Sequence, residues 1–400
     1  MAHGNQFVDD PKMDPKLADK GFKLGIAMAV IGLGAALASL AGGSKEQFFY
    51  SWLIAGMTFT TICLGCLFVV LVHHITRAMW STTLRRLAEN ITSALPFMAI
   101  LMLPILFLGM HDLYHWTHAE AVAKDSILQS KEGYLNSVFF VVRTLVYFAL
   151  WIVIARFYRK LSVRQDETGD VALTFKMRWW APLSILAFAF SVSYAGFDWI
   201  MSLDPHWFST MFGVIIFGGS MVSGFAALGL YALWLTKNKT LNNTITEWNF
   251  HDCAKLMWGF VIFWTYTSFS QYFLIWYGNI AEETAWYAVR MNNGWNKMGW
   301  LLIAGHFVLP FWLLLSRHMK RNRLAFGLVA AWMIFMHYID IYYMAMPNLH
   351  HHLHFSWVDA ACFIGIGGVF LAAVMRASGK DAVVAHRDPQ LHASMNYDNF

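Results

Sequence analysis

Long apolar runs recur along the whole chain, separated by short polar stretches. Each run is close to or above the ~20 residues that a helix needs to cross the hydrocarbon core of a bilayer. The pattern predicts an all-α integral membrane protein with ten transmembrane helices. The ten runs lie at 22–42, 49–73, 91–110, 136–158, 180–198, 208–236, 254–279, 297–317, 324–345 and 357–376.

Lys and Arg residues occupy every second gap between these runs. Of the 29 such residues, 23 lie in the N-terminal arm, the even-numbered gaps and the C-terminal tail. Because basic loops stay on the cytoplasmic side of a membrane, both termini are expected to be cytoplasmic. The sequence therefore divides into a cytoplasmic arm at 1–20, a membrane domain at 21–376 and a cytoplasmic tail at 377–400.

The composition excludes a soluble globular domain, because 58% of the residues are hydrophobic and only 13% are charged. The net charge of +5 is spread over loops beside anionic lipid, so no nucleic-acid partner is expected. Cys63 and Cys66 have a metal-ligand spacing, but they lie inside an apolar run, where a helix-packing pair is favoured. No haem-attachment or ferredoxin-type cysteine pattern occurs, so neither a haem nor an iron–sulfur cluster is expected on this chain.

A short pattern recurs where the fifth and ninth runs end. Asp198 is followed seven residues later by Pro205, and Asp340 is followed at the same distance by Pro347. These are the fifth and the ninth predicted spans, so they cross the membrane in the same direction. This predicts two parallel four-helix bundles, spans 2–5 and spans 6–9, flanked by spans 1 and 10.

Ionisable residues inside a span cost about 2.5–3.5 kcal/mol on insertion, so each is a candidate functional residue. Arg143 and Asp198 lie at similar depth on neighbouring spans. They form either a buried pair that fixes helix register or a site at which the carboxylate accepts a proton. His306 and His337 also share a depth, roughly 12–14 Å below the outer boundary. They could ligate a haem, but only one such pair exists. With Asp340, they are better interpreted as an outward-leading proton relay or as satisfied core groups.

Histidines also gather in the outer loops. His111, His115 and His118 would share one face of a helix that continued past the third span, with Asp112 beside them. A metal site, a proton-handling role and ordinary interface polarity all remain open, and we predict no metal. The tract from His350 to His354 is interpreted as a solvated or subunit-contacting loop.

Three segments together resemble a known family. They are residues 78–89 (AMWSTTLRRLAE), 197–212 (FDWIMSLDPHWFSTMF) and 270–279 (SQYFLIWYGN). They are similar to the polysulfide-reductase-type (NrfD-like) membrane subunits of bacterial alternative complex III, in particular to the shorter of its two such subunits. The resemblance covers about residues 20 to 376.

The resemblance implies a subunit of a quinol:cytochrome c oxidoreductase in the bacterial inner membrane, using menaquinone or ubiquinone. It implies as partners an iron–sulfur subunit, multihaem cytochromes c, a sister subunit of the same fold, small membrane subunits and a terminal oxidase. A quinol site would lie at the periplasmic end of the first bundle, with catalytic roles for four residues of that zone (Asp198, His111, Asp112 and Arg143). The whole zone holds His111, Asp112, His115, Arg143, Asp198 and Asp204.

Other functions remain open. Within the same complex, the chain would be a structural anchor or a proton-translocating module without its own quinone site. Outside that complex, the chain could be a transporter or channel, and such proteins typically have inverted repeats and spans that are broken near the middle of the membrane. The repeat found here is parallel, which makes that alternative weaker.

Overall fold

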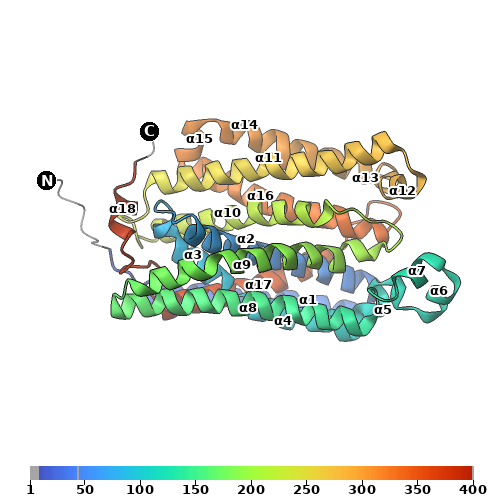
Figure 1. The fold of residues 1–400 in the computed structure, drawn as a ribbon, viewed down its shortest axis with the longest axis horizontal. Helices are drawn as coiled ribbons and strands as arrows, with labels where there is room; N and C mark the ends of the chain where they lie inside the picture. The colour runs from blue at the N-terminus through green and yellow to red at the C-terminus, as the bar shows by residue number, and fades with distance from the viewer. Residues whose placement is uncertain (1–8, 43–44, 399–400) are drawn as a thin grey trace.

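The computed structural model describes residues 9–42 and 45–398 and contains helices but no strand among them. The first eight residues of the predicted N-terminal arm lie outside this part of the chain. Figure 1 shows the long helices lying side by side. The helices are α1 (Pro15–Ala38), α2 (Lys45–Ile75), α3 (Thr82–Thr92), α4 (Leu95–Pro104), α5 (Met110–Leu113), α6 (Ala119–Lys124), α7 (Ser126–Lys131), α8 (Ser137–Thr168), α9 (Ala172–Trp199), α10 (Phe212–Lys237), α11 (Glu247–Gly278), α12 (Ala281–Arg290), α13 (Trp295–Leu301), α14 (Leu309–Leu315), α15 (Arg317–Arg321), α16 (Arg323–Ala345), α17 (Trp357–Lys380) and α18 (Leu391–Met395).

Within the described residues, nine helical segments are long and apolar enough to cross a membrane, and the chain is a multi-pass membrane protein. These segments correspond to nine of the ten predicted runs. The remaining run, 254–279, belongs to α11, which has 32 residues and is not among the nine. At 1.5 Å per residue α11 is about 48 Å long, and it lies beside α10 (Figure 1). Its many Trp and Tyr side chains make it less apolar, so a tenth crossing stays a prediction.

The helix array has two distinct ends. Helix α3, the turn between α8 and α9, α15 and α18 lie together at one end (Figure 1). We call it the basic end, because the Lys and Arg residues predicted to be cytoplasmic flank these elements. The short helices α5, α6, α7 and α12 lie at the opposite end, which we call the loop end. Which end faces the cytoplasm remains a prediction from charge.

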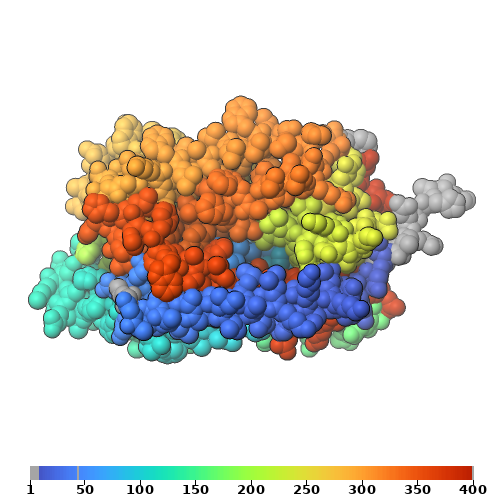
Figure 2. Space-filling model, turned by 180° about the vertical axis from the view of Figure 1, so that it is seen from behind, coloured from blue at the N-terminus to red at the C-terminus, as the bar shows by residue number. Residues whose placement is uncertain are grey.

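Small residues allow two pairs of helices to approach closely. Where α2 crosses α10, a Cβ atom on Gly65 would lie 2.0 Å from the carbonyl oxygen of Ser220. Where α1 runs along α17, a Cβ on Gly32 would lie 2.3 Å from the backbone nitrogen of Gly365. Such small-residue contacts are typical of helix packing in membranes, where backbones gain dispersion contacts by approaching. Figure 2 shows α1, in blue, lying along one face of the molecule.

The C-terminal tail is folded into the basic end. Val383 is fully buried, and Asp388 accepts a hydrogen bond from Arg85 Nη1 at 2.6 Å. Arg85 and Arg86 are themselves fully buried, and their Nε atoms donate to the two oxygens of Glu89. The segment predicted as a cytoplasmic tail is therefore part of a buried ionic network, which explains why α3 can carry charges inside the protein.

Candidate functional site

Arg143 on α8 and Asp198 on α9 form a buried two-point ion pair near the loop end. Nε and Nη2 of Arg143 donate to Oδ2 and Oδ1 of Asp198 at 2.8 and 3.0 Å. The Tyr147 hydroxyl also donates to Oδ2, at 2.8 Å. Two parallel charge-assisted bonds are the strong form of this interaction. The predicted pairing of Arg143 with Asp198 is confirmed, and both carboxylate oxygens already have partners.

Aromatic rings enclose the Arg143 guanidinium. Its carbon lies 3.9 Å from the ring centre of Tyr134 and 4.3 Å from that of Phe139. Its third nitrogen, Nη1, donates to the Tyr134 carbonyl at 2.8 Å. Stacking on ring faces stabilises a cation in a desolvated place. The pair therefore ties α8, α9 and the loop before α8 together.

The outer histidines do not share a helix. α5 ends at Leu113, and His118 has an extended backbone, so the expected helical face through His118 is wrong. The chain turns instead, and the His118 ring still lies 5.4 Å from that of His111 and 6.0 Å from that of His115. All three side chains are exposed. No group of three potential ligands among the described residues is placed to hold a metal ion.

Asp112 and Asp204 are half-buried at the same end. The segment that carries Asp112 is held to the end of α9 by Tyr114, whose hydroxyl donates to the Trp199 carbonyl at 3.0 Å. However, none of the hydrogen bonds or ion pairs of the described residues joins Asp112 or Asp204 to the Arg143 pair. The predicted quinol zone is thus one region of the molecule but not one hydrogen-bonded cluster.

A second buried polar cluster surrounds Trp264 on α11. The indole N–H of Trp264 donates to Asp340 Oδ2 at 2.9 Å, and its ring centre lies 3.9 Å from that of His306. On α16, one turn from Asp340, His337 Nε2 lies 2.7 Å from the hydroxyl of Thr61 on α2. His306, His337 and Asp340 are at most 3% exposed. The three residues of the predicted relay therefore lie in one cluster, while the relay itself stays a prediction.

Three ring nitrogens of this cluster have no hydrogen-bond partner among the described residues: Nδ1 and Nε2 of His306, and Nδ1 of His337. His306 belongs to a π-helical turn, Leu302–Val308, a local widening that is frequent at functional sites. Gly219 on α10 leaves room beside His337, because a Cβ there would lie 2.9 Å from Nδ1. An unpaired buried polar atom costs about 1–3 kcal/mol, so the cluster calls for an explanation beyond packing.

A narrow apolar cleft opens between α2, α4, α8 and α9. Trp199 forms one wall, directly after Asp198 in the chain, and Thr60 supplies a hydroxyl group to the lining. Its free volume is about 10 Å³, close to that of one water molecule, and the flexible thioether side chains in its lining could rearrange to widen it. The lining residues are Trp52, Gly56, Met57, Thr60, Met98, Leu101, Met102, Ile105, Phe148 and Trp199.

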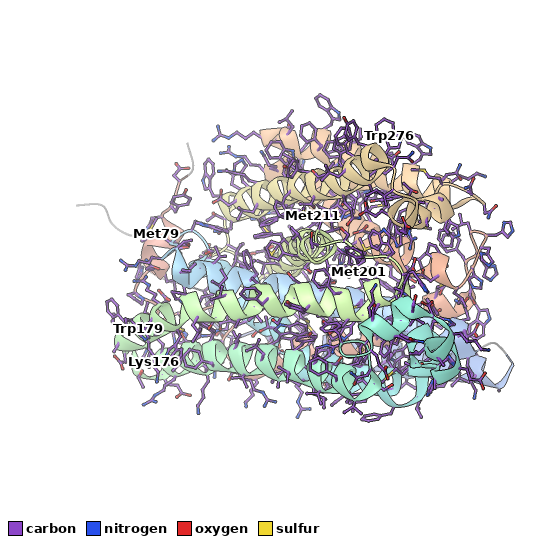
Figure 3. The ribbon with its side chains drawn as sticks, turned by 45° about the vertical axis from the view of Figure 1, so that its right-hand side comes forward. Met79, Lys176, Trp179, Met201, Met211 and Trp276 are labelled. Atoms are coloured by element: carbon purple, nitrogen blue, oxygen red, sulfur yellow. The ribbon has the colours of Figure 1, made fainter. Side chains whose placement is uncertain are left out.

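Sequence reasoning missed the groups that join these clusters. Trp264 is one of 19 Trp residues, most of which have ordinary interfacial or packing positions, so nothing distinguished it. Thr61 lies in an apolar run with no charged residue near it, and Tyr147, one turn after Arg143, was not predicted as a further partner of Asp198. Their roles depend on which helices become adjacent, and a single sequence carries no direct signal of that. Figure 3, which draws the side chains, shows how densely they fill the space between the helices.

No protein-family model matches this chain, and a comparison with curated proteins finds no significant match.

Proposed function

We propose that this chain is a proton-handling membrane subunit of a quinol-oxidising electron-transfer complex, of the polysulfide-reductase type described above. The observation that carries this proposal is the cluster of His306, His337 and Asp340 around Trp264. Ionisable groups within a membrane span are expensive and often mark proton relays or ion pathways. The ten-span architecture with two four-helix bundles is part of the proposal.

The cluster supports proton transfer because its members can both accept and release a proton. Imidazole exchanges protons between its two nitrogens, and two of the three free ring nitrogens belong to His306. Asp340 accepts one hydrogen bond from Trp264 and forms no ion pair within the described part of the chain. A carboxyl group without a fixed cation can change its protonation state without breaking an ion pair. These properties favour a relay over a purely structural polar core.

The proposed quinol site lies in the first bundle, beside Trp199. The apolar side chains of the cleft beside Trp199 are of the kind that contact a quinone ring, but the free space between them is only about 10 Å³, so a quinone would enter only if these side chains or helices moved apart. Because both oxygens of Asp198 already accept hydrogen bonds, we assign Arg143 and Asp198 to positioning the wall of this cleft. Oxidation of one quinol releases two protons and two electrons. The exposed His111, with His115 nearby, would receive the protons at the loop end, which this proposal places on the periplasmic side.

The electrons would leave to partner subunits. The proposed partners are an iron–sulfur protein, multihaem cytochromes c, a sister subunit of this fold, small membrane subunits and a terminal oxidase, in a bacterial inner membrane. Tagging the full-length chain in its native membrane and purifying it gently tests this directly. Co-purified iron–sulfur and haem-containing proteins would support the proposal, and their absence from an intact, folded preparation would contradict it.

Proton handling is tested in the purified complex, reconstituted into vesicles that contain a pH-sensitive dye. Asp340→Asn and His337→Gln are each expected to lower the number of protons moved per electron at least twofold. Thr265→Val is the matched control on α11, because within the described residues that hydroxyl bonds only to the Val261 carbonyl. An unchanged proton-to-electron ratio in both assembled variants would leave the cluster as structural and the chain as an anchor.

A further inference from the structure

The hairpin of α8 and α9 at the basic end has a fixed register. The Tyr158 hydroxyl on α8 donates to the Met177 carbonyl on α9 at 3.3 Å. The rings of Phe157 and Trp180 meet edge to face, with centres 6.3 Å apart. These contacts place the last three turns of α8 directly beside the first turns of α9.

Three basic side chains surround this aromatic contact. Lys160 and Arg164 follow Phe157 by three and seven residues on α8, and Lys176 precedes Trp180 by four on α9. At 100° per residue, these spacings put each basic residue within about 60° of the adjacent aromatic ring. All three are exposed, and none takes part in an ion pair within the described residues. By contrast, Arg159 is half-buried and pairs with Asp381.

The depth of this group corresponds to the edge of a bilayer. About 20 residues of helix cross the hydrocarbon core. Counted from the loop end, that length runs from Ser137 to about Phe157 on α8, and from Trp199 back to about Trp179 on α9. Trp179 is 81% exposed, and Lys176 comes one turn beyond it (Figure 3). The basic side chains therefore begin where the hydrocarbon core would end.

The surface just inside this level is open and mostly apolar, with Arg156 as an exposed charge at its edge. Val153 on α8 is 65% exposed, and Leu183 and Leu186 on α9 are 58% and 56% exposed. This surface suits acyl chains, and the bordering Trp179 is typical of the level of lipid head groups. The acidic side chains nearby, Glu167 and Asp170, lie further out, in the last turn of α8 and the connection to α9.

We propose that Lys160, Arg164 and Lys176 bind the phosphate of an anionic phospholipid whose acyl chains lie along the α8–α9 hairpin. Three unpaired cations attract the phosphodiester, and the adjacent apolar surface distinguishes a lipid from a soluble anion. An acidic protein segment would match the charges but would not account for the exposed Val, Leu and Trp side chains beside them. The proposal is independent of any role in quinol oxidation.

The test uses purified full-length protein in detergent and native mass spectrometry with added phosphatidylglycerol or phosphatidylcholine. The unaltered protein is expected to bind more phosphatidylglycerol than phosphatidylcholine. In Lys160→Gln/Lys176→Gln, the ratio of bound phosphatidylglycerol to bound phosphatidylcholine is expected to fall at least five-fold. Lys160→Arg/Lys176→Arg, which keeps the charge, should restore it. Lys237→Gln/Lys239→Gln is the matched control, since it removes two exposed charges from another turn at the same end.

Three results would overturn the proposal. Equal loss in the Lys237/Lys239 control would show general charge attraction rather than a site. Displacement of phosphatidylglycerol by millimolar inorganic phosphate would indicate a soluble anion site. Binding of a polyglutamate peptide in place of the lipid, lost in the same Gln variant, would indicate a protein partner.

Discussion

The buried pair of Arg143 and Asp198 makes a quantitative prediction about stability. Asp198→Ala removes the carboxylate that accepts from Arg143 Nε and Nη2 and from the Tyr147 hydroxyl. The Arg143 side chain, 9% exposed, stays buried with its charge uncompensated. Removing one partner of a buried ion pair costs about 3–5 kcal/mol, and the freed Tyr147 hydroxyl adds about 1 kcal/mol. The rings of Tyr134 and Phe139 would return part of this, about 1 kcal/mol by cation–π attraction.

The net expectation is that Asp198→Ala lowers the free energy of unfolding by about 3–5 kcal/mol. The assay is SDS titration of the purified full-length protein in mixed micelles, followed by loss of its tertiary signal. Arg143→Met/Asp198→Ala leaves no unpaired charge and should recover at least about 2 kcal/mol of that loss. Ser193→Ala on α9 removes an exposed hydroxyl bonded to Ala189 and should change stability by less than about 0.5 kcal/mol. A single variant within about 1 kcal/mol of the parent protein would refute the reasoning.

Two further predictions concern helix packing and pH. Gly65→Ala places a methyl group 2.0 Å from the Ser220 carbonyl oxygen, so α2 and α10 must separate. The same titration is expected to show a loss of at least about 3 kcal/mol in the free energy of unfolding. Gly56→Ala on the same helix meets no atom within 4 Å and should leave the stability unchanged or slightly raised. Equal behaviour of the two variants would contradict close packing at Gly65. Burial lowers the pKa of His350 from its ordinary 6.5, as does the charge of His354, so the folded state resists protonation of His350. The stability of the loop at 346–356 is therefore full above about pH 6.5 and declines as the pH falls below it. Hydrogen–deuterium exchange, corrected for the intrinsic pH effect, should show faster exchange there at pH 5.5 than at 7.5, and a smaller difference in His350→Gln; equal differences would remove His350 as the cause.

The apolar pattern alone was sufficient to predict most of the helices. Nine of the predicted runs coincide with helical segments that can cross a membrane, because a helix in lipid must be apolar along its whole length and this leaves a long signal. Helix ends were less well predicted. The first helix begins at Pro15, not near residue 22, and the third ends at Leu113, between His111 and His115. Polar residues after an apolar run can either continue the helix outside the membrane or end it, and the sequence of these residues does not show which of the two occurs.

The sequence also indicated the depth of each charged residue in the membrane, counted in residues from the end of its predicted span. This depth was enough to pair Arg143 with Asp198. A buried charge without a partner is costly, so two opposite charges at the same depth on neighbouring spans are expected to form an ion pair. The same reasoning placed His306 and His337 in one layer. Depth does not say which faces meet, so the indole of Trp264 between His306 and Asp340 was not foreseen.

The sequence by itself determined the class of the protein, the positions of most of its helices and the depth of its buried charges. These follow from local composition and from the 1.5 Å rise of a helix. Only the tertiary structure decided the partners of those charges: Thr61 for His337, Trp264 for Asp340, and Asp388 of the tail for Arg85. Each of these contacts joins residues at least 76 positions apart, on separate helices or on a helix and the tail. Its formation depends on the packing of small residues such as Gly65, which sets which helices become neighbours.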